Sequence, residues 1–183
     1  MTTHTITIGE FSRKLPVREV KEGVSVALFN PLGDWELNEA IGAALSEKVP
    51  EGVDIILMPD GKAQAMLHVV GRNAKKRTMV AKKEVKSYMK QPVIQGVRDE
   101  CMTAGSGESF YLGADQAEEL KDKKVLIFDD VVSTGGSLKA IRNLLEKTGA
   151  TEAGVLCAFT EGGERDGVIS LGNLPVNGPW KED

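Results

Sequence analysis

The sequence predicts an α/β fold with a mainly parallel central sheet, and three segments carry this prediction. Residues 125–128 form an apolar, β-branched run typical of a strand buried on both faces, and a helical pattern of leucine and isoleucine follows it. Residues 53–58 begin the same arrangement earlier in the chain. Residues 153–159 form another apolar run after the helix. A strand–helix–strand unit with a right-handed crossover is therefore expected.

The N-terminal 33 residues predict short strands before the first helix. Ile6 and Ile8 alternate with threonines, which indicates an edge strand, and residues 24–29 resemble a further strand. Asp34 is expected to cap a helix whose apolar positions share one face. Those positions are Leu37, Ala40, Ile41, Ala44 and Leu45.

After the strand at 53–58 come a tight turn at 59–62 and a helical pattern, and residues 77–81 predict the next strand. Residues 87–112 are too rich in glycine and serine for one long element, and this composition is typical of a mobile lid. Residues 115–122 indicate a short helix or turn that leads into the strand at 125–128.

Length and composition predict a single domain over residues 1–183, with an N-terminal segment (1–33), a core (34–170) and a C-terminal tail (171–183). The tail is expected to hold an edge strand and a loose end. No apolar run reaches the roughly 20 residues of a membrane span, and two cysteines are too few for a disulfide framework, so we expect a cytoplasmic protein. The net charge of −4 argues against general nucleic-acid binding.

The most informative stretch is KVLIFDDVVSTGGS, at residues 124–137. Its strand leads into two adjacent carboxylates, Asp129 and Asp130, and then into a loop of hydroxyl groups and glycines at a helix start. A helix N-terminus offers unpaired N–H groups and a partial positive charge to an anion. The two carboxylates would repel a phosphate, so they must face another part of the ligand, such as vicinal hydroxyls or Mg²⁺. A phosphorylated sugar satisfies both halves, whereas a Walker loop is absent.

Residues 129–137 resemble the signature of the type I phosphoribosyltransferases, which bind 5-phosphoribosyl-1-pyrophosphate (PRPP). The resemblance implies a three-layer α/β/α fold with a small N-terminal hood at residues 1–33. It also implies that Asp129 and Asp130 are catalytic, contact the ribose hydroxyls, and hold Mg²⁺ directly or through water. The implied PRPP-binding residues of this stretch are Asp129, Asp130, Val131, Val132, Ser133, Thr134, Gly135, Gly136 and Ser137.

Two further segments take expected roles from the same resemblance. The turn at 59–62 corresponds to the loop that holds pyrophosphate, which makes Asp60, Gly61 and Lys62 candidates there. Lys82 and Lys83 resemble the basic pair that ends the next strand and meets the pyrophosphate. Phe159 and Glu161 are candidates for binding the base, although Gly162 stands where xanthine members carry a lysine.

The function implied is a magnesium-dependent purine phosphoribosyltransferase of purine salvage, with PRPP and a purine base as substrates. Adenine is the favoured base, and AMP and pyrophosphate are the products. The family commonly forms dimers, so a homodimer is expected, with no membrane or nucleic-acid partner. Two alternatives remain open: an enzyme of the xanthine or guanine type, and a regulatory protein that senses PRPP without chemistry.

Overall fold

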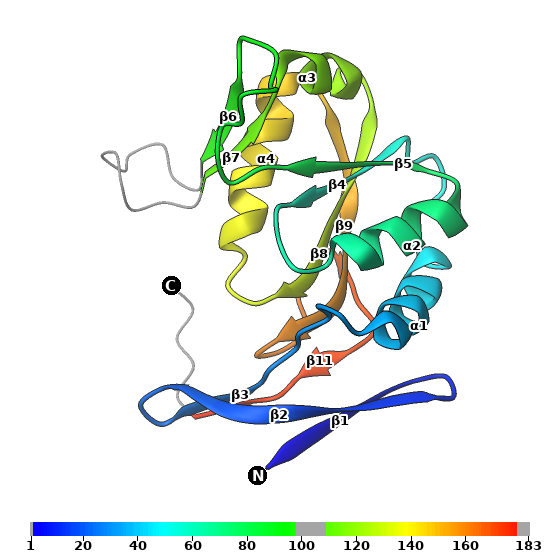
Figure 1. The fold of residues 1–183 in the computed structure, drawn as a ribbon, viewed down its shortest axis with the longest axis vertical. Coiled ribbons are helices and arrows are strands. Elements are labelled where there is room, and N and C mark those ends of the chain that lie inside the picture. The colour runs from blue at the N-terminus through cyan, green and yellow to red at the C-terminus, as the bar shows by residue number, and fades with distance from the viewer. Residues whose placement is uncertain (1, 98–108, 179–183) are drawn as a thin grey trace.

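A computed structural model describes residues 2–97 and 109–178, and its largest sheet forms the centre of the molecule (Figure 1). The strand order is β10-β9-β8-β4-β5, with β11 also paired to β9, and all of these pairs are parallel. The strands are β4 (Ile55–Pro59), β5 (Arg77–Ala81), β8 (Lys124–Val132), β9 (Thr151–Glu161), β10 (Val168–Ile169) and β11 (Asn173–Leu174). The predicted parallel sheet is confirmed.

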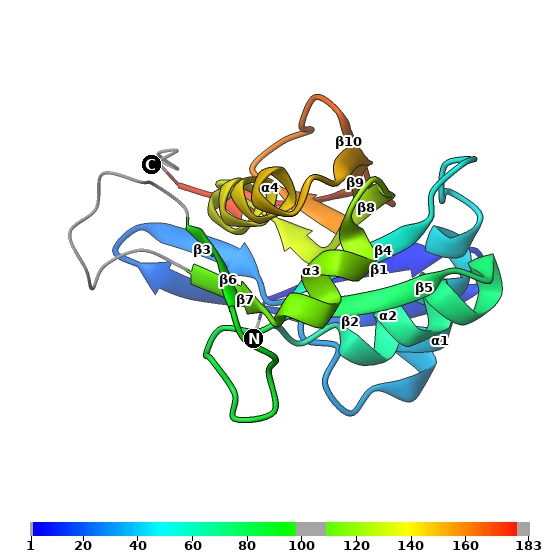
Figure 2. The same cartoon turned by 90° about the horizontal axis from the view of Figure 1, so that it is seen from above.

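Helices cover both faces of this sheet, as Figure 2 shows from above. They are α1 (Trp35–Ser46), α2 (Gln64–Ala74), α3 (Ala114–Leu120) and α4 (Gly136–Thr148). Because side chains alternate along a strand, Leu126 and Phe128 of β8 belong to the core under α1 and α2. Val125 and Ile127 belong instead to the core under α3 and α4. The three-layer prediction is therefore confirmed.

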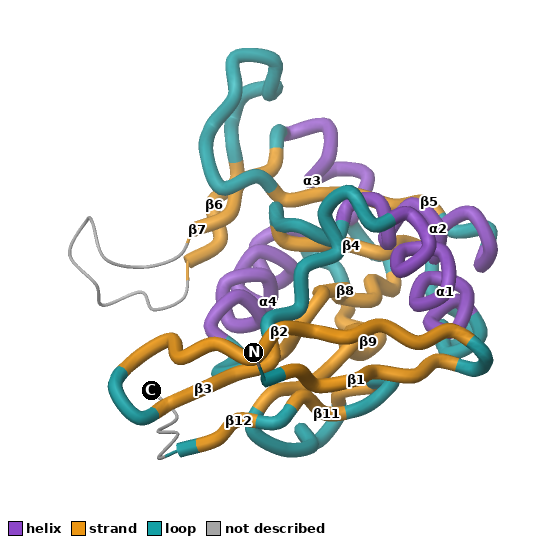
Figure 3. The backbone as a smooth tube through the Cα atoms, turned by 60° about the horizontal axis from the view of Figure 1, so that its bottom comes forward, coloured by secondary structure: helices purple, strands orange, loops and turns teal. Residues whose placement is uncertain are grey.

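A second, antiparallel sheet forms the hood and has the order β1-β2-β3-β12 (Figure 3). Its strands are β1 (Thr3–Ile8), β2 (Phe11–Lys21), β3 (Val24–Ala27) and β12 (Val176–Asn177). The sequence did not predict β2, the longest of them. The tail supplies both β11 of the central sheet and β12 of the hood, so the edge strand predicted there joins the two sheets. Residues 179–183, the last part of the predicted tail, lie outside the described residues.

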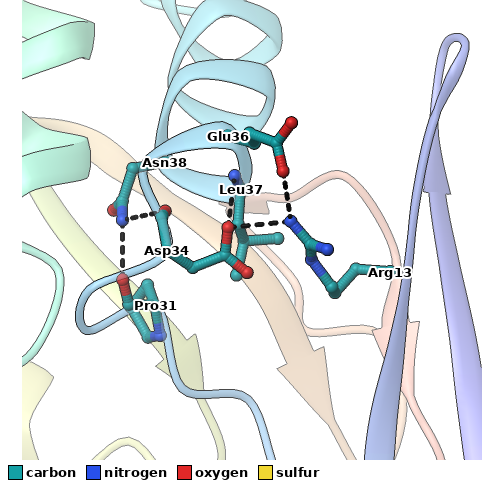
Figure 4. Close-up of polar contacts among 6 residues, drawn as sticks. All are labelled: Arg13, Pro31, Asp34, Glu36, Leu37 and Asn38. Atoms are coloured by element: carbon teal, nitrogen blue, oxygen red, sulfur yellow. Dashed lines mark hydrogen bonds and ion pairs between the residues drawn. The ribbon is translucent and has the colours of Figure 1, made fainter.

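The start of α1 ties the hood to the core (Figure 4). The predicted cap is confirmed, since the Asp34 carboxylate accepts a hydrogen bond from the Leu37 N–H at 3.1 Å. Arg13 of β2 donates to the same carboxylate at 2.9 Å and to Glu36 at 3.1 Å. Hydrogen bonds between side chains thus fix the hood against the first helix.

Part of the predicted lid is regular structure instead. β6 (Ile94–Val97) and β7 (Ser109–Leu112) form an antiparallel hairpin packed against α4, while residues 98–108 lie outside the described residues. Gly96 makes this packing possible, because a Cβ there would lie 2.3 Å from the Ala140 carbonyl oxygen and 2.6 Å from the Leu144 Cβ. In the sequence, Gly96 argued against regular structure, but in the fold the packing of the hairpin on α4 requires this glycine.

Gly96→Ala is expected to lower the free energy of unfolding by about 1–3 kcal/mol, the usual cost of overpacking. The backbone oxygen of Ala140 cannot move without distorting α4. Gly172→Ala is the matched control, because its added Cβ would meet only the Phe159 ring at an ordinary 3.9 Å. Urea unfolding of both variants checks this, and equal stabilities would show that the hairpin does not depend on close packing against α4.

Cys157 is fully buried in β9, as the apolar run around it predicts. Burial, together with the nearby Asp129 carboxylate, raises the pKa of its thiol to about 12. Within the described residues, no helix combines the length and apolarity needed to cross a lipid bilayer.

Candidate active site

The acidic pair lies near the carboxyl end of the central sheet. β8 runs through Asp129 and Asp130 to Val132, so the strand is longer than the predicted segment 125–128. The Asp129 carboxylate accepts a hydrogen bond from the Asp130 N–H at 2.8 Å. The Asp130 side chain is only 15% exposed, and its carboxylate lies 3.8 Å from the Lys62 ammonium. The acidic pair and the turn at 59–62 therefore lie close together.

The loop after β8 forms an anion cradle. Gly135 has a φ of +80° and caps α4 without a side-chain hydrogen bond, so the first-turn N–H groups have no side-chain acceptor at the cap. A pocket of about 150 Å³ opens at this turn. It is lined by Asp129, Val131, Val132, Ser133, Thr134, Gly135, Gly136, Ser137 and Leu138. Its size, polarity and helix terminus suit a phosphate group.

A second pocket of about 230 Å³ lies between the acidic pair and the turn at 59–62. Asp60, Gly61, Lys62 and Lys83 all line it, as does Phe110 of β7, which the sequence analysis did not single out. The Lys83 ammonium lies 5.9 Å from the centre of the Phe110 ring, within the range of a cation–π contact. The structure thus brings one of the two predicted lysines to the pocket wall.

Lys82 does not line this pocket and contacts the turn instead. Its ammonium donates to the Asp60 carboxylate at 3.3 Å, and Gln64 donates to the same oxygen at 2.8 Å. Asp60 is an acid in a loop expected to hold an anion, and Lys82 partly neutralises it.

A third pocket of about 260 Å³ lies between the hood and the core. Its lining is Ala27, Leu28, Phe29, Lys62, Asp130, Val131, Ser133 and Glu161. Phe159, a predicted base contact, is only 3% exposed and packs edge-on against Phe29, with ring centroids 5.2 Å apart. Phe29 rather than Phe159 therefore faces this pocket.

Glu161 is the other predicted base contact, and it lines the third pocket. Burial raises the pKa of its carboxyl above the usual value. Lys62 opposes that shift, and Asp130 adds to it. The carboxyl therefore sits in a partly desolvated place near both charges.

The three pockets share residues and meet at the acidic pair. Asp129 lines the first two, Asp130 lines the second and third, and Val131 lines all three. An anion cradle, a pocket that contains two lysines and a partly apolar pocket thus surround two carboxylates. This arrangement suits a ligand that joins a phosphate, a hydroxyl-bearing sugar, a second anion and a flat ring.

Residues 39–169 of the chain match the phosphoribosyl transferase domain family. The chain belongs to the phosphoribosyltransferase family. The match covers well over half of the chain and includes the acidic pair, the anion cradle and the turn at 59–62. It includes none of the hood strands.

Individual phosphoribosyltransferases match over shorter segments. An adenine phosphoribosyltransferase from Corynebacterium jeikeium is 43% identical over 68 residues, which are 37% of this chain and 32% of that protein. An HGPRTase-like protein from Halobacterium salinarum is 49% identical over 43 residues, or 24% of this chain and 23% of that protein. The matched segments span about a third or less of these curated relatives.

Solved phosphoribosyltransferase structures match over more of the chain. Adenine phosphoribosyltransferase from Leishmania tarentolae has a TM-score of 0.60 at 18% identity and covers 75% of this chain and 71% of its own. The Giardia lamblia enzyme, solved with 9-deazaadenine, has a TM-score of 0.60 at 15% identity and covers 93% of both chains. At these identities the likeness establishes the fold.

Proposed function

We propose that this chain is a magnesium-dependent purine phosphoribosyltransferase that joins a purine base, adenine first, to the phosphoribosyl group of PRPP. The products are a nucleoside 5′-monophosphate, AMP for adenine, and pyrophosphate. The observation that carries the proposal is the meeting of three pockets at Asp129 and Asp130. The family resemblance adds a homodimer acting in cytoplasmic purine salvage.

Each pocket has a role in this reaction. The turn at 133–137 and the first N–H groups of α4 hold the 5′-phosphate, and Asp129 and Asp130 hold the ribose hydroxyls. A nitrogen of the base attacks C1 of the ribose from the hood side while pyrophosphate leaves toward the turn at 59–62. The ribose ring is positively charged in the transition state, and the Asp129 and Asp130 carboxylates stabilise that charge.

The leaving group carries the largest charge in the reaction. Lys83 lines the pocket assigned to it, and Lys82 reaches the same turn through Asp60. Lys62 also lines that pocket, so positive charge is available on two sides. Positioning and charge neutralisation do most of the work here, since the protein forms no covalent bond to the substrate.

The residues present fit a magnesium ion that arrives with its ligand. Among residues 2–97 and 109–178, no group of three or more His, Cys, Asp or Glu side chains is placed to hold a metal ion by itself. Mg²⁺ commonly takes one or two carboxylates and completes its shell with substrate phosphates and water. Asp129 and Asp130 would supply the carboxylates, and the ion would neutralise charge on the departing pyrophosphate.

A base-panel assay tests the proposal. The protein is incubated with Mg²⁺, PRPP and one purine at a time, and pyrophosphate release is measured. We expect release with adenine and loss of it when EDTA removes the metal. No pyrophosphate with any purine, despite PRPP binding, would refute the enzymatic assignment.

The second candidate function is PRPP sensing without chemistry, and the Asp60–Lys82 pair favours it. This pair places a negative charge in the pyrophosphate loop and occupies one of the predicted lysines. Calorimetric binding of PRPP without any turnover would support the sensor over the enzyme.

A further inference from the structure

Glu161 holds an unusual place in the pocket between hood and core. It is the last residue of β9, and its backbone pairs in register with Leu174 of β11, which fixes the start of its side chain. The carboxylate lines the pocket and is partly buried. Within the described part of the chain, it makes no hydrogen bond or salt bridge. A partly desolvated carboxylate without a protein donor has acceptor capacity that a ligand can use.

Other polar groups of this pocket either have protein partners or line a neighbouring part of the site. The Lys62 ammonium donates to the Phe29 carbonyl oxygen at 3.2 Å and faces the Asp130 carboxylate at 3.8 Å. The Leu28 N–H donates to the Pro16 carbonyl oxygen at 2.9 Å. Ser133 also lines the anion cradle, and Asp130 belongs to the pair assigned to the ribose. Glu161 is therefore the side chain whose acceptor capacity is available to a base.

We propose that Glu161 accepts a hydrogen bond from an exocyclic amino group of the base and thereby selects aminopurines over purines with a carbonyl at that position. This inference rests on the proposed function, because it assigns the third pocket to the base. A carbonyl oxygen facing the Glu161 carboxylate would bring two acceptors together with no proton between them. Sites built to hydrogen-bond a donor reject analogues that lack it far more strongly than apolar pockets do.

Adenine and hypoxanthine give the sharpest comparison, because they differ only in the amino or carbonyl group and the adjoining ring proton. The matching nucleotides, AMP and IMP, allow binding to be measured without turnover. Glu161→Gln keeps the size of the side chain but replaces the carboxylate with an amide, which can donate as well as accept. Glu164→Gln makes the same change at an exposed residue three positions later that does not line this pocket.

The experiment measures dissociation constants of AMP and IMP by calorimetry, and kcat/KM with adenine and hypoxanthine, for wild type and both variants. Because burial raises the pKa of the Glu161 carboxyl, the measurements are made at mildly alkaline pH, which favours its ionised form. We expect wild type and Glu164→Gln to prefer AMP. In Glu161→Gln, the preference for AMP over IMP should fall roughly tenfold or more.

Two outcomes would overturn the inference. One is an unchanged preference for AMP over IMP in Glu161→Gln. The other is a wild-type preference for IMP, which would indicate that Lys62 donates a hydrogen bond to the carbonyl group of the base. Failure of the proposed function looks different. In that case, AMP and IMP binding would respond to Glu161→Gln as expected while neither base released pyrophosphate, and the inference would hold for a nucleotide-binding protein.

Discussion

Asp130→Asn is expected to lower turnover by about 10²–10³-fold, the usual effect of removing one group that stabilises transition-state charge. The Asp130 carboxylate lines both the second and the third pocket, and its side chain is only 15% exposed. An amide of the same shape keeps the packing but loses the negative charge that stabilises the positively charged ribose ring in the transition state. Steady-state pyrophosphate release measures the effect.

Asp54→Asn is the matched control. Asp54 accepts a hydrogen bond from the Lys124 N–H at 2.9 Å, at the opposite end of the same strand, and an amide oxygen can still accept it. Both variants lose one negative charge, so a general electrostatic effect would appear in both. Near-normal turnover in Asp130→Asn, with an unchanged melting temperature, would contradict the role assigned to the acidic pair.

The central sheet could be predicted because its strands have strong, local signals. The apolar run before Asp129 and the helix ended by Gly149 are both unambiguous, and Gly149 adopts the left-handed conformation of a helix C-cap with φ of +73°. Buried parallel strands need continuous apolar sequence, and few other structures use it. The elements that carry the anion cradle are therefore the easiest to recognise.

The strand β2 escaped prediction because charged residues and Pro16 interrupt its alternation. Proline usually argues against an interior strand, because it has no N–H to donate. Here Pro16 lies opposite Leu28, just beyond the β2–β3 register that begins at Val17 and Ala27. Its carbonyl oxygen accepts a hydrogen bond from the Leu28 N–H at 2.9 Å, so only the reciprocal bond at this end of the ladder is lost. The position of a proline relative to the end of a neighbouring strand cannot be obtained from the strand's own sequence.

The candidate site shows the same division between local and distant signals. The residues of the anion cradle are contiguous, so their sequence predicted their arrangement. The contact of Lys62 with Asp130 and Phe29 joins three separate segments, and only the fold brings them together. Phe110 reaches the second pocket from a hairpin that the glycine-rich sequence concealed.

Gly135→Ala is expected to weaken binding of ribose 5-phosphate roughly tenfold or more, and it tests the anion cradle without removing any polar group. Gly135 has a φ of +80°, which an L-residue adopts at a cost of about 1–2 kcal/mol. The added Cβ would meet no protein atom within 4 Å, so its effect must come from altered backbone at the cap or from contact with the ligand. Calorimetric titration with ribose 5-phosphate measures it.

Gly23→Ala separates strain from binding. Gly23 has a φ of +73° in the hood, and its Cβ would also meet nothing within 4 Å, so both variants should lose similar stability, about 1–2 kcal/mol. Only Gly135 lines the anion cradle, and only its variant should lose affinity. Because the helix N-terminus binds through backbone N–H groups rather than side chains, the shape of this turn determines the affinity. Equal affinities in the two variants would place the phosphate elsewhere.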